Sequence, residues 1–164
     1  MPRVLAYRRH PRRPNRRLRG SKAFSRDVIV EEAGNLLQLR NRITALVVDN
    51  SISIQLYHTA LLSRFGVDNR AVENGQQVVD LYCNGASFDL ILMDNFMPVV
   101  NGRQATRTLR AMGVRSMIVG VSSVFREDER QEFIDAGLDD FQEKPLTCAK
   151  LIHILRELES SLSF

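Results

Sequence analysis

Cysteine is scarce in this chain, and long hydrophobic runs are missing from it. The two cysteines among its 164 residues, Cys83 and Cys148, lie far apart with no second ligand group near either. This argues against a disulfide scaffold or a cysteine-based zinc site and favours a reducing intracellular compartment, cytoplasm or nucleus. No run of 18 apolar residues occurs, which argues against a membrane-spanning helix. The length and the 44% hydrophobic content fit one globular domain with a buried core.

Acidic residues are absent from the first 26 positions. These positions hold nine arginines and one lysine, a net charge of +10, whereas the other 138 residues hold 13 basic against 19 acidic side chains, a net charge of −6. Dense like charge with few apolar residues predicts a disordered arm. Three interpretations stay open for it: a solvated tail or a wrongly assigned start, a nuclear-import or nucleic-acid contact, and an organelle transit peptide.

Residues 27–42 fit either a short amphipathic helix or a linker. We therefore assign residues 1–42 to a basic arm and linker, and residues 43–160 to the folded domain.

The rest of the chain lacks internal repeats and alternates between two periodicities. Short apolar runs predict strands near 45–48, 90–93 and 117–121, and two short stretches near 69–72 and 140–142, which are not apolar throughout, fit two further strands. Helical spacing predicts helices near 54–65, 76–82, 102–112 and 127–136, with a last helix capped by Thr147. Strands that are apolar throughout are buried on both faces. The pattern therefore predicts an α/β fold, a doubly wound five-stranded parallel sheet with helices on both faces.

Polar residues stand directly after four of the predicted strands. In chain order they are Asp49 with Asn50, Asp94, Ser122 with Ser123, and Lys144. In open parallel sheets, ligands bind beyond the carboxyl ends of the strands, so these side chains are expected to converge on one edge. Taken singly, each has an ordinary explanation as a turn former, a helix cap or a surface lysine. Their joint occurrence at four strand ends favours function.

The chemistry of this set suits a phosphoryl group. Two carboxylates in one cleft repel each other, and a hard divalent cation such as Mg²⁺ relieves that repulsion. Lys144 supplies a positive charge, and Ser122 a hydrogen-bond donor, for phosphate oxygens.

Four sequence blocks carry a resemblance to a known family. They are Leu46-Val47-Val48-Asp49, Asp94-Asn95-Phe96-Met97-Pro98 with Gly102, Val121-Ser122-Ser123, and Glu143-Lys144-Pro145. Over residues 43–160 the chain resembles the receiver domain of two-component response regulators. Segments 86–94 and 116–121 are similar to the plant stand-alone, type-C class. The resemblance implies a flavodoxin-like sheet of strand order 2-1-3-4-5.

The resemblance also implies a phosphorelay partner and a metal. Asp94 would accept a phosphoryl group from a histidine phosphotransfer protein, which an upstream hybrid histidine kinase supplies. Asp49, Asn50, the Asp94 carboxylate and the backbone carbonyl of Phe96 would hold Mg²⁺.

Three further residues gain roles from the resemblance. Lys144 would pair with the Asp94 carboxylate before transfer and with the phosphoryl oxygens afterwards. Ser122 would hydrogen-bond the phosphoryl group, and Phe141 matches the aromatic that turns inward when the site is filled.

The chain departs from the family pattern at the end of its first predicted strand. The family has two acids there, and Asn50 replaces the second, which lowers the formal carboxylate charge of the site from −3 to −2. We therefore expect weaker Mg²⁺ binding than in relatives with two acids. Ser122 stands for the commoner threonine, and Ser123 for a smaller residue. Phe96 and Val124 are bulky and apolar where receivers control water access, which suggests a long-lived phospho-form.

The leading hypothesis is a single-domain response regulator that acts as a signalling switch or a phosphoryl drain, with no output domain expected after Phe164. It would catalyse its own phosphorylation and dephosphorylation, and as a drain it would act as a phosphohistidine phosphatase. In the plant families it resembles, the relay serves cytokinin signalling. The alternative is a pseudo-receiver, a binding module whose phosphorylation Asn50 impairs. DNA binding through the arginine-rich arm is a third hypothesis.

Overall fold

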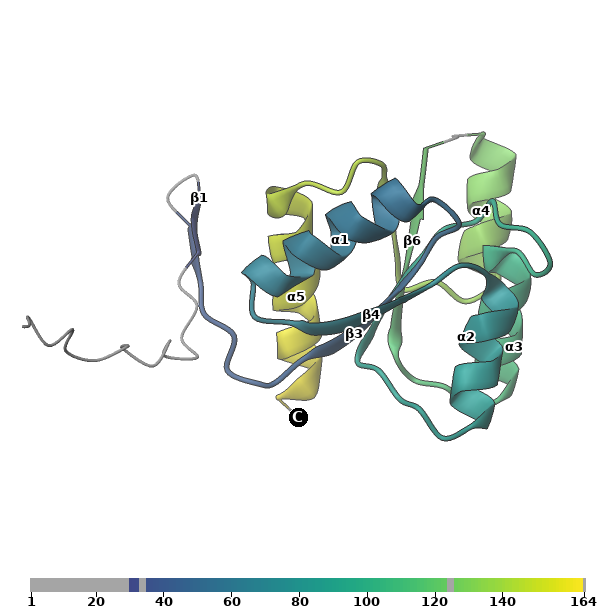
Figure 1. Ribbon diagram of the computed structural model, residues 1–164, viewed down its shortest axis with the longest axis horizontal. Coiled ribbons are helices and arrows are strands. Elements are labelled where there is room, and N and C mark those ends of the chain that lie inside the picture. Colours follow the sequence, from purple (N-terminus) through teal and green to yellow (C-terminus); the bar gives the residue numbers. More distant parts are fainter. Residues whose placement is uncertain (1–29, 33–34, 124–125, 164) are drawn as a thin grey trace, which may run out of the picture.

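The computed structural model describes residues 30–32, 35–123 and 126–163. Its central sheet has five parallel strands in the spatial order β4-β3-β5-β6-β7 (Figure 1). In chain order these strands are β3 (Thr44–Val48), β4 (Asp68–Val72), β5 (Leu90–Met93), β6 (Met117–Ser122) and β7 (Asp140–Glu143). Counted along the chain, their spatial order is 2-1-3-4-5, which confirms the predicted fold class.

Helices cover both faces of this sheet. They are α1 (Ile52–Arg64), α2 (Gly75–Cys83), α3 (Gly102–Ala111), α4 (Glu127–Asp135) and α5 (Cys148–Leu162). In Figure 1, α1 and α5 lie on one side of the sheet, and α2, α3 and α4 on the other. Each side has its own core cluster. In β3, Ala45 and Val47 face the first cluster, whereas Leu46 and Val48 face the second, because successive side chains of a strand point to opposite faces.

Side-chain caps define where three helices begin. The Asn74 side chain accepts a hydrogen bond from the backbone N–H of Gln77 at the start of α2, and Asn101 forms a reciprocal capping box with Gln104 at the start of α3. Thr147 accepts from the backbone N–H of Lys150, so the cap predicted for the last helix is confirmed.

The segment before the sheet differs from the helix or linker expected at 27–42. Strands β1 (Val30–Glu32) and β2 (Asn35–Leu37) pair antiparallel, so their backbone groups bond to each other instead of within a helix. Leu37 is buried in the cluster between the sheet and the α1–α5 layer. The Glu159 carboxylate accepts hydrogen bonds from the backbone N–H groups of Arg40 and Asn41, which fastens the segment to α5.

Two sequence expectations fall outside the described residues. These are the disordered basic arm at 1–26 and the part of Val124 in controlling water access. Within the described ranges, no helix combines the length and hydrophobicity needed to cross a membrane.

Candidate functional site

Backbone pairing aims three ionisable side chains at the carboxyl edge of the sheet. Asp49 follows β3 and donates its N–H to the carbonyl of Val72 on β4 at 3.1 Å. Asp94 follows β5 and donates to Val48 at 2.9 Å, and Lys144 follows β7 and donates to Ser122 at 2.9 Å. Each strand is thus extended by one paired residue, which fixes the direction in which its side chain leaves the sheet.

The ammonium group of Lys144 joins the two carboxylates. Its Nζ lies 2.5 Å from Asp49 Oδ2 and 3.3 Å from Asp94 Oδ1. The three side chains are 11%, 3% and 6% exposed, respectively. Two buried carboxylates therefore share one buried ammonium, which leaves a formal charge of −1.

Burial alters the acidity of Asp94. Desolvation raises the pKa of its carboxyl above the usual range, the Lys144 charge lowers it, and the Asp49 charge raises it again. The Lys144 charge therefore does not fully offset the cost of burying the charged carboxylate of Asp94. A further cation or an electrophile at this carboxylate would relieve that imbalance.

A pocket of about 480 Å³ opens directly onto these charges. Its lining consists of Asp49, Asn50, Ser51, Ile54, Asp94, Phe96, Ser123, Lys144 and Pro145. Asn50 is exposed, and Phe96 is 44% exposed at the rim. The structure thus brings together all four residues predicted to hold a metal, together with the predicted lysine. Two buried carboxylates, an amide oxygen at the rim and a net negative charge form a donor set that suits Mg²⁺.

Ser122 and Phe141 lie beside this pocket instead of lining it. They border a small neighbouring cavity that also touches Phe96, Arg130 and Phe133. Ser122 is 2% exposed, and the Phe141 ring packs edge-on against Phe133 with the Arg130 guanidinium 5.6 Å from its centroid. The aromatic is therefore half-buried against α4 in this structure.

Gly102 explains one part of the sequence motif. It begins α3 and donates its N–H to the carbonyl of Asn95 at 3.1 Å. A Cβ at this position would overlap the Asp94 carbonyl oxygen and press on the Phe133 ring. The absence of a side chain at Gly102 lets α3 begin directly against the backbone of Asp94.

Helix α1 supports the site through residues that the sequence did not single out. Gln55 donates from Nε2 to the backbone carbonyl of Asp49 at 2.6 Å, and the Ser51 N–H donates to Asp49 Oδ1 at 2.8 Å. The hydroxyl of Tyr57 donates to the carbonyl of Leu146 at 2.8 Å, which ties α1 to the segment that follows Lys144. In the sequence, Tyr57 only matched the apolar face of a helix, so no local signal distinguished it.

His58 lies on the same helix and is only 2% exposed. The pKa of its imidazole is lowered to about 4, mainly by burial and also by the Lys144 charge, while the Asp49 charge opposes the shift. His58 is therefore neutral at pH 7.

Comparisons with known protein families and sequences agree with this fold. The protein-family model for the response regulator receiver domain matches residues 45–156 of this chain. Two-component response regulator 24 of Arabidopsis thaliana is 52% identical over 135 residues, covering 82% of this chain and 96% of that protein. Two-component response regulator ARR22 of the same plant is 43% identical, covering 71% of this chain and 83% of that protein.

Solved structures show the same fold. The receiver domain of the sensor histidine kinase PA1611 from Pseudomonas aeruginosa PAO1, solved with a magnesium ion in its active-site cleft, matches with a TM-score of 0.66 and 30% identity over 73% of this chain and 99% of that chain. The receiver domain of Saccharomyces cerevisiae Ssk1, solved with the histidine phosphotransfer protein Ypd1, matches with a TM-score of 0.68 and 20% identity over 75% of this chain and 92% of that chain. Sequence, fold and family match agree: this chain belongs to the response regulator receiver domain family of two-component signalling.

Proposed function

We propose that Asp94 accepts a phosphoryl group from the phosphohistidine of a histidine phosphotransfer protein, in a Mg²⁺-dependent relay fed by a hybrid histidine kinase. The observation that carries this proposal is the arrangement of Asp94 itself. Its carboxylate is buried beside Lys144 and Asp49, has a raised pKa and still borders an open pocket. The family to which the chain belongs and the neighbour solved with a phosphotransfer protein support this choice of donor.

The transfer requires little covalent chemistry from the protein. A carboxylate oxygen of Asp94 forms a bond to phosphorus while the phosphorus–nitrogen bond of the donor breaks, and the electron pair of that bond returns to the imidazole, which takes up a proton. The product is an acyl phosphate on Asp94. The ammonium group of Lys144, 3.3 Å from Asp94 Oδ1, then pairs with the oxygens of the transferred phosphoryl group. Positioning and charge neutralisation are the main contributions.

A divalent cation suits this pocket. We propose that Asp49, Asp94, the amide oxygen of Asn50 and the backbone carbonyl of Phe96 hold Mg²⁺, which would neutralise the charge that builds up during transfer. The neighbour solved with magnesium in its cleft supports this assignment. Because Asn50 brings no formal charge, the Asn50→Asp variant should bind Mg²⁺ more tightly in a titration. Unchanged affinity would contradict this reading of Asn50.

Ser122 and Phe141 act after transfer in this proposal. Ser122 is buried just outside the pocket and would turn its hydroxyl toward the phosphoryl oxygens. Phe141 borders the same small cavity, and its ring would turn inward after the Ser122 hydroxyl has moved. The surface formed by α4, β7 and α5 would then change shape, and a partner protein could recognise the phospho-form by this change.

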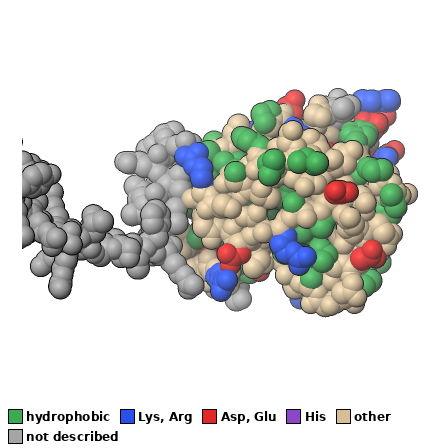
Figure 2. Space-filling view, in the orientation of Figure 1, with side chains coloured by type: hydrophobic (Ala, Val, Ile, Leu, Met, Phe, Trp, Pro, Cys, Tyr) green, Lys and Arg blue, Asp and Glu red, His purple; other side chains and the backbone are tan. Residues whose placement is uncertain are grey.

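The donor protein would dock over the pocket and α1. Large apolar side chains are exposed here, and no described part of the chain covers them. They are Ile52, Leu56 and Tyr57 on α1, and Phe96 and Val99 in the loop after β5. Figure 2 shows hydrophobic side chains gathered on the face of the molecule where α1 lies. An apolar surface around a buried acceptor allows a partner to exclude water from the transfer.

The test is transfer of label from a ³²P-phosphorylated histidine phosphotransfer protein to the purified full chain, with and without Mg²⁺. We expect label on the wild type, none on Asp94→Ala, and wild-type labelling of Asp80→Ala, which removes an exposed acid from α2. Loss of donor label without accumulation on the chain would identify a phosphoryl drain, that is, phosphohistidine phosphatase activity. A donor that stays labelled at all Mg²⁺ concentrations would overturn the proposal in favour of a pseudo-receiver disabled at Asn50.

A further inference from the structure

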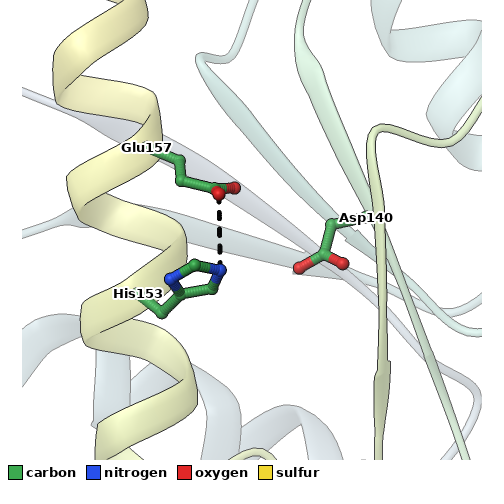
Figure 3. Close-up of side chains that lie close together, drawn as sticks. All are labelled: Asp140, His153 and Glu157. Atoms are coloured by element: carbon green, nitrogen blue, oxygen red, sulfur yellow. Dashed lines mark ion pairs between the residues drawn. The ribbon is translucent and has the colours of Figure 1, made fainter.

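Three metal-ligating side chains meet outside the phosphorylation pocket. Asp140 stands at the start of β7, and His153 and Glu157 lie on α5. One donor atom from each comes within 4.8 Å of the other two. Figure 3 shows the Asp140 carboxylate pointing from the strand toward the two helix side chains. None of these residues lines the pocket around Asp94.

His153 and Glu157 already have the spacing of a chelating pair. They are four residues apart, so they lie on one face of the helix, the arrangement by which helical residues grip a shared ion. Their Nε2 and Oε1 atoms are 3.3 Å apart. Two ligands that each lie about 2.1 Å from a tetrahedral zinc are roughly 3.4 Å from one another. An ion could therefore replace the present contact with little movement of the helix.

Asp140 is held in place for the third position. Its Oδ1 accepts a hydrogen bond from the N–H of Phe141 at 2.7 Å, and its Oδ2 accepts one from Gln142 Nε2 at 2.7 Å. Each carboxylate oxygen has a second lone pair, so these bonds fix the orientation of the carboxylate and leave it able to coordinate.

We propose that Asp140, His153 and Glu157 form a site for a borderline divalent transition ion, Zn²⁺ being the reference case. A neutral imidazole with two carboxylates carries a charge of −2, and the nitrogen donor favours Zn²⁺ over Mg²⁺, which prefers oxygen ligands. His153 is 61% exposed and Glu157 48% exposed, so water can complete the coordination. The ion would bridge α5 to β7 one residue before Phe141, on the α4–β7–α5 face.

The test is calorimetric titration of Zn²⁺ into the full chain with excess Mg²⁺ present to occupy the phosphorylation pocket. We expect one site in the wild type. The variants His153→Ala and Asp140→Asn should bind at least about tenfold more weakly, since even the loss of an outer-shell partner of a metal lowers affinity by roughly 10–100-fold. Glu143→Gln is the matched control, because it removes an exposed acid from the same strand and should bind as the wild type does.

A second measurement separates this site from other ligands in the chain. Zn²⁺ binding to the folded state should raise the thermal midpoint of the wild type and of Glu143→Gln, but not that of His153→Ala or Asp140→Asn. Circular dichroism confirms that each variant is folded. Zn²⁺ binding that survives both triad substitutions would overturn the proposal. So would binding that depends instead on Asp49 in the phosphorylation pocket or on His10 in the basic arm.

Discussion

The two edges of the central sheet both carry charged side chains beside a pocket, but they use these charges differently. The amino edge has the larger hollow, about 610 Å³, and the carboxyl edge has one of about 480 Å³. Tyr82, Asp89, Ser116 and Asp139 are among the residues that line the larger one. By size and polarity alone, the amino edge would be the better candidate for a binding site.

Hydrogen bonding to the backbone occupies the polar groups of the amino edge. Asp89 Oδ2 accepts from both the N–H and the hydroxyl of Thr44, at 2.8 and 3.0 Å. Asp139 Oδ2 accepts from the N–H of Ile118 and from Arg110, each at 2.8 Å. Arg110 gives its other donors to the carbonyls of three loop residues, namely Gly137, Val114 and Ser116. These charges hold loops and strands together.

At the carboxyl edge the charges face one another. Lys144 divides its ammonium between Asp49 and Asp94, and the pKa of Asp94 stays raised because burial outweighs that attraction. Charged groups that are buried, mutually paired and still next to a pocket are the groups left available for a ligand. The difference between the edges therefore lies in how the polar atoms are engaged, and the volume of the hollow does not reveal it.

The largest effect is expected from removing the charge at Lys144. In Lys144→Gln, phosphoryl transfer to Asp94 should slow by about 10²–10³-fold, the range found when one preorganised donor to a transition state is removed. The initial rate of label transfer from the phosphorylated donor measures this. Lys150→Gln is the matched control, because the Lys150 ammonium donates a hydrogen bond to the backbone carbonyl of Glu143 at 2.9 Å and does not line the pocket around Asp94. Equal rates in both variants would contradict the assignment of the site to this edge.

Arg110 should behave in the opposite way. Arg110→Ala removes four hydrogen bonds, three of them partly buried, so the free energy of unfolding should fall by about 2–4 kcal/mol, while transfer by the remaining folded protein stays unchanged. Urea unfolding and the transfer assay check the two halves of this prediction. Arg107→Ala, an exposed change on the same helix, should alter stability by no more than about 0.5 kcal/mol. Loss of transfer with unchanged stability would erase the contrast between the two edges.

The sequence predicts the three central strands of the sheet well because they are buried on both faces. Runs such as Leu90–Met93 are apolar throughout, so strand identity and sheet edge follow directly. Asp49 and Asp94 can be identified because each directly follows such a run, whereas Lys144 follows a short and mostly polar strand. Tyr57 and His58 cannot be identified in this way, since a helical pattern fixes which face is buried but not which distant loop that face meets.

Two other features depend on contacts that no local pattern records. The pairing of 30–32 with 35–37 competes with an amphipathic helix in the same segment, and Glu159, more than 100 residues away, fastens the chain that follows. The triad of Asp140, His153 and Glu157 unites a strand and a helix whose relative placement comes from packing. Residues 13 positions apart cannot be assigned to one site from their spacing alone.

The last effect is confined to acid and concerns His58 beneath the carboxyl edge. Its Nε2 is buried with no hydrogen-bond partner among the described residues. Because the pKa of His58 is about 4 in the folded protein against 6.5 for the free side chain, the unfolded chain binds a proton first as the pH falls. The stability linked to this group is fully present above pH 6.5 and is lost between pH 6.5 and 4, by up to about 3 kcal/mol.

The variant His58→Leu should remove that dependence. It fills the same space with an apolar side chain, so unfolding at pH 7.5 should need as much urea as in the wild type or more, whereas the loss of stability toward pH 4 should be smaller. His153→Ala is the control, because this histidine is exposed on α5 and its loss should leave the wild-type slope in place. If His58→Leu keeps the full acid sensitivity, the charges responsible lie elsewhere. In that case the contrast between the two edges would rest on the pairing of Lys144 with two carboxylates, and the buried imidazole of His58 would contribute nothing to it.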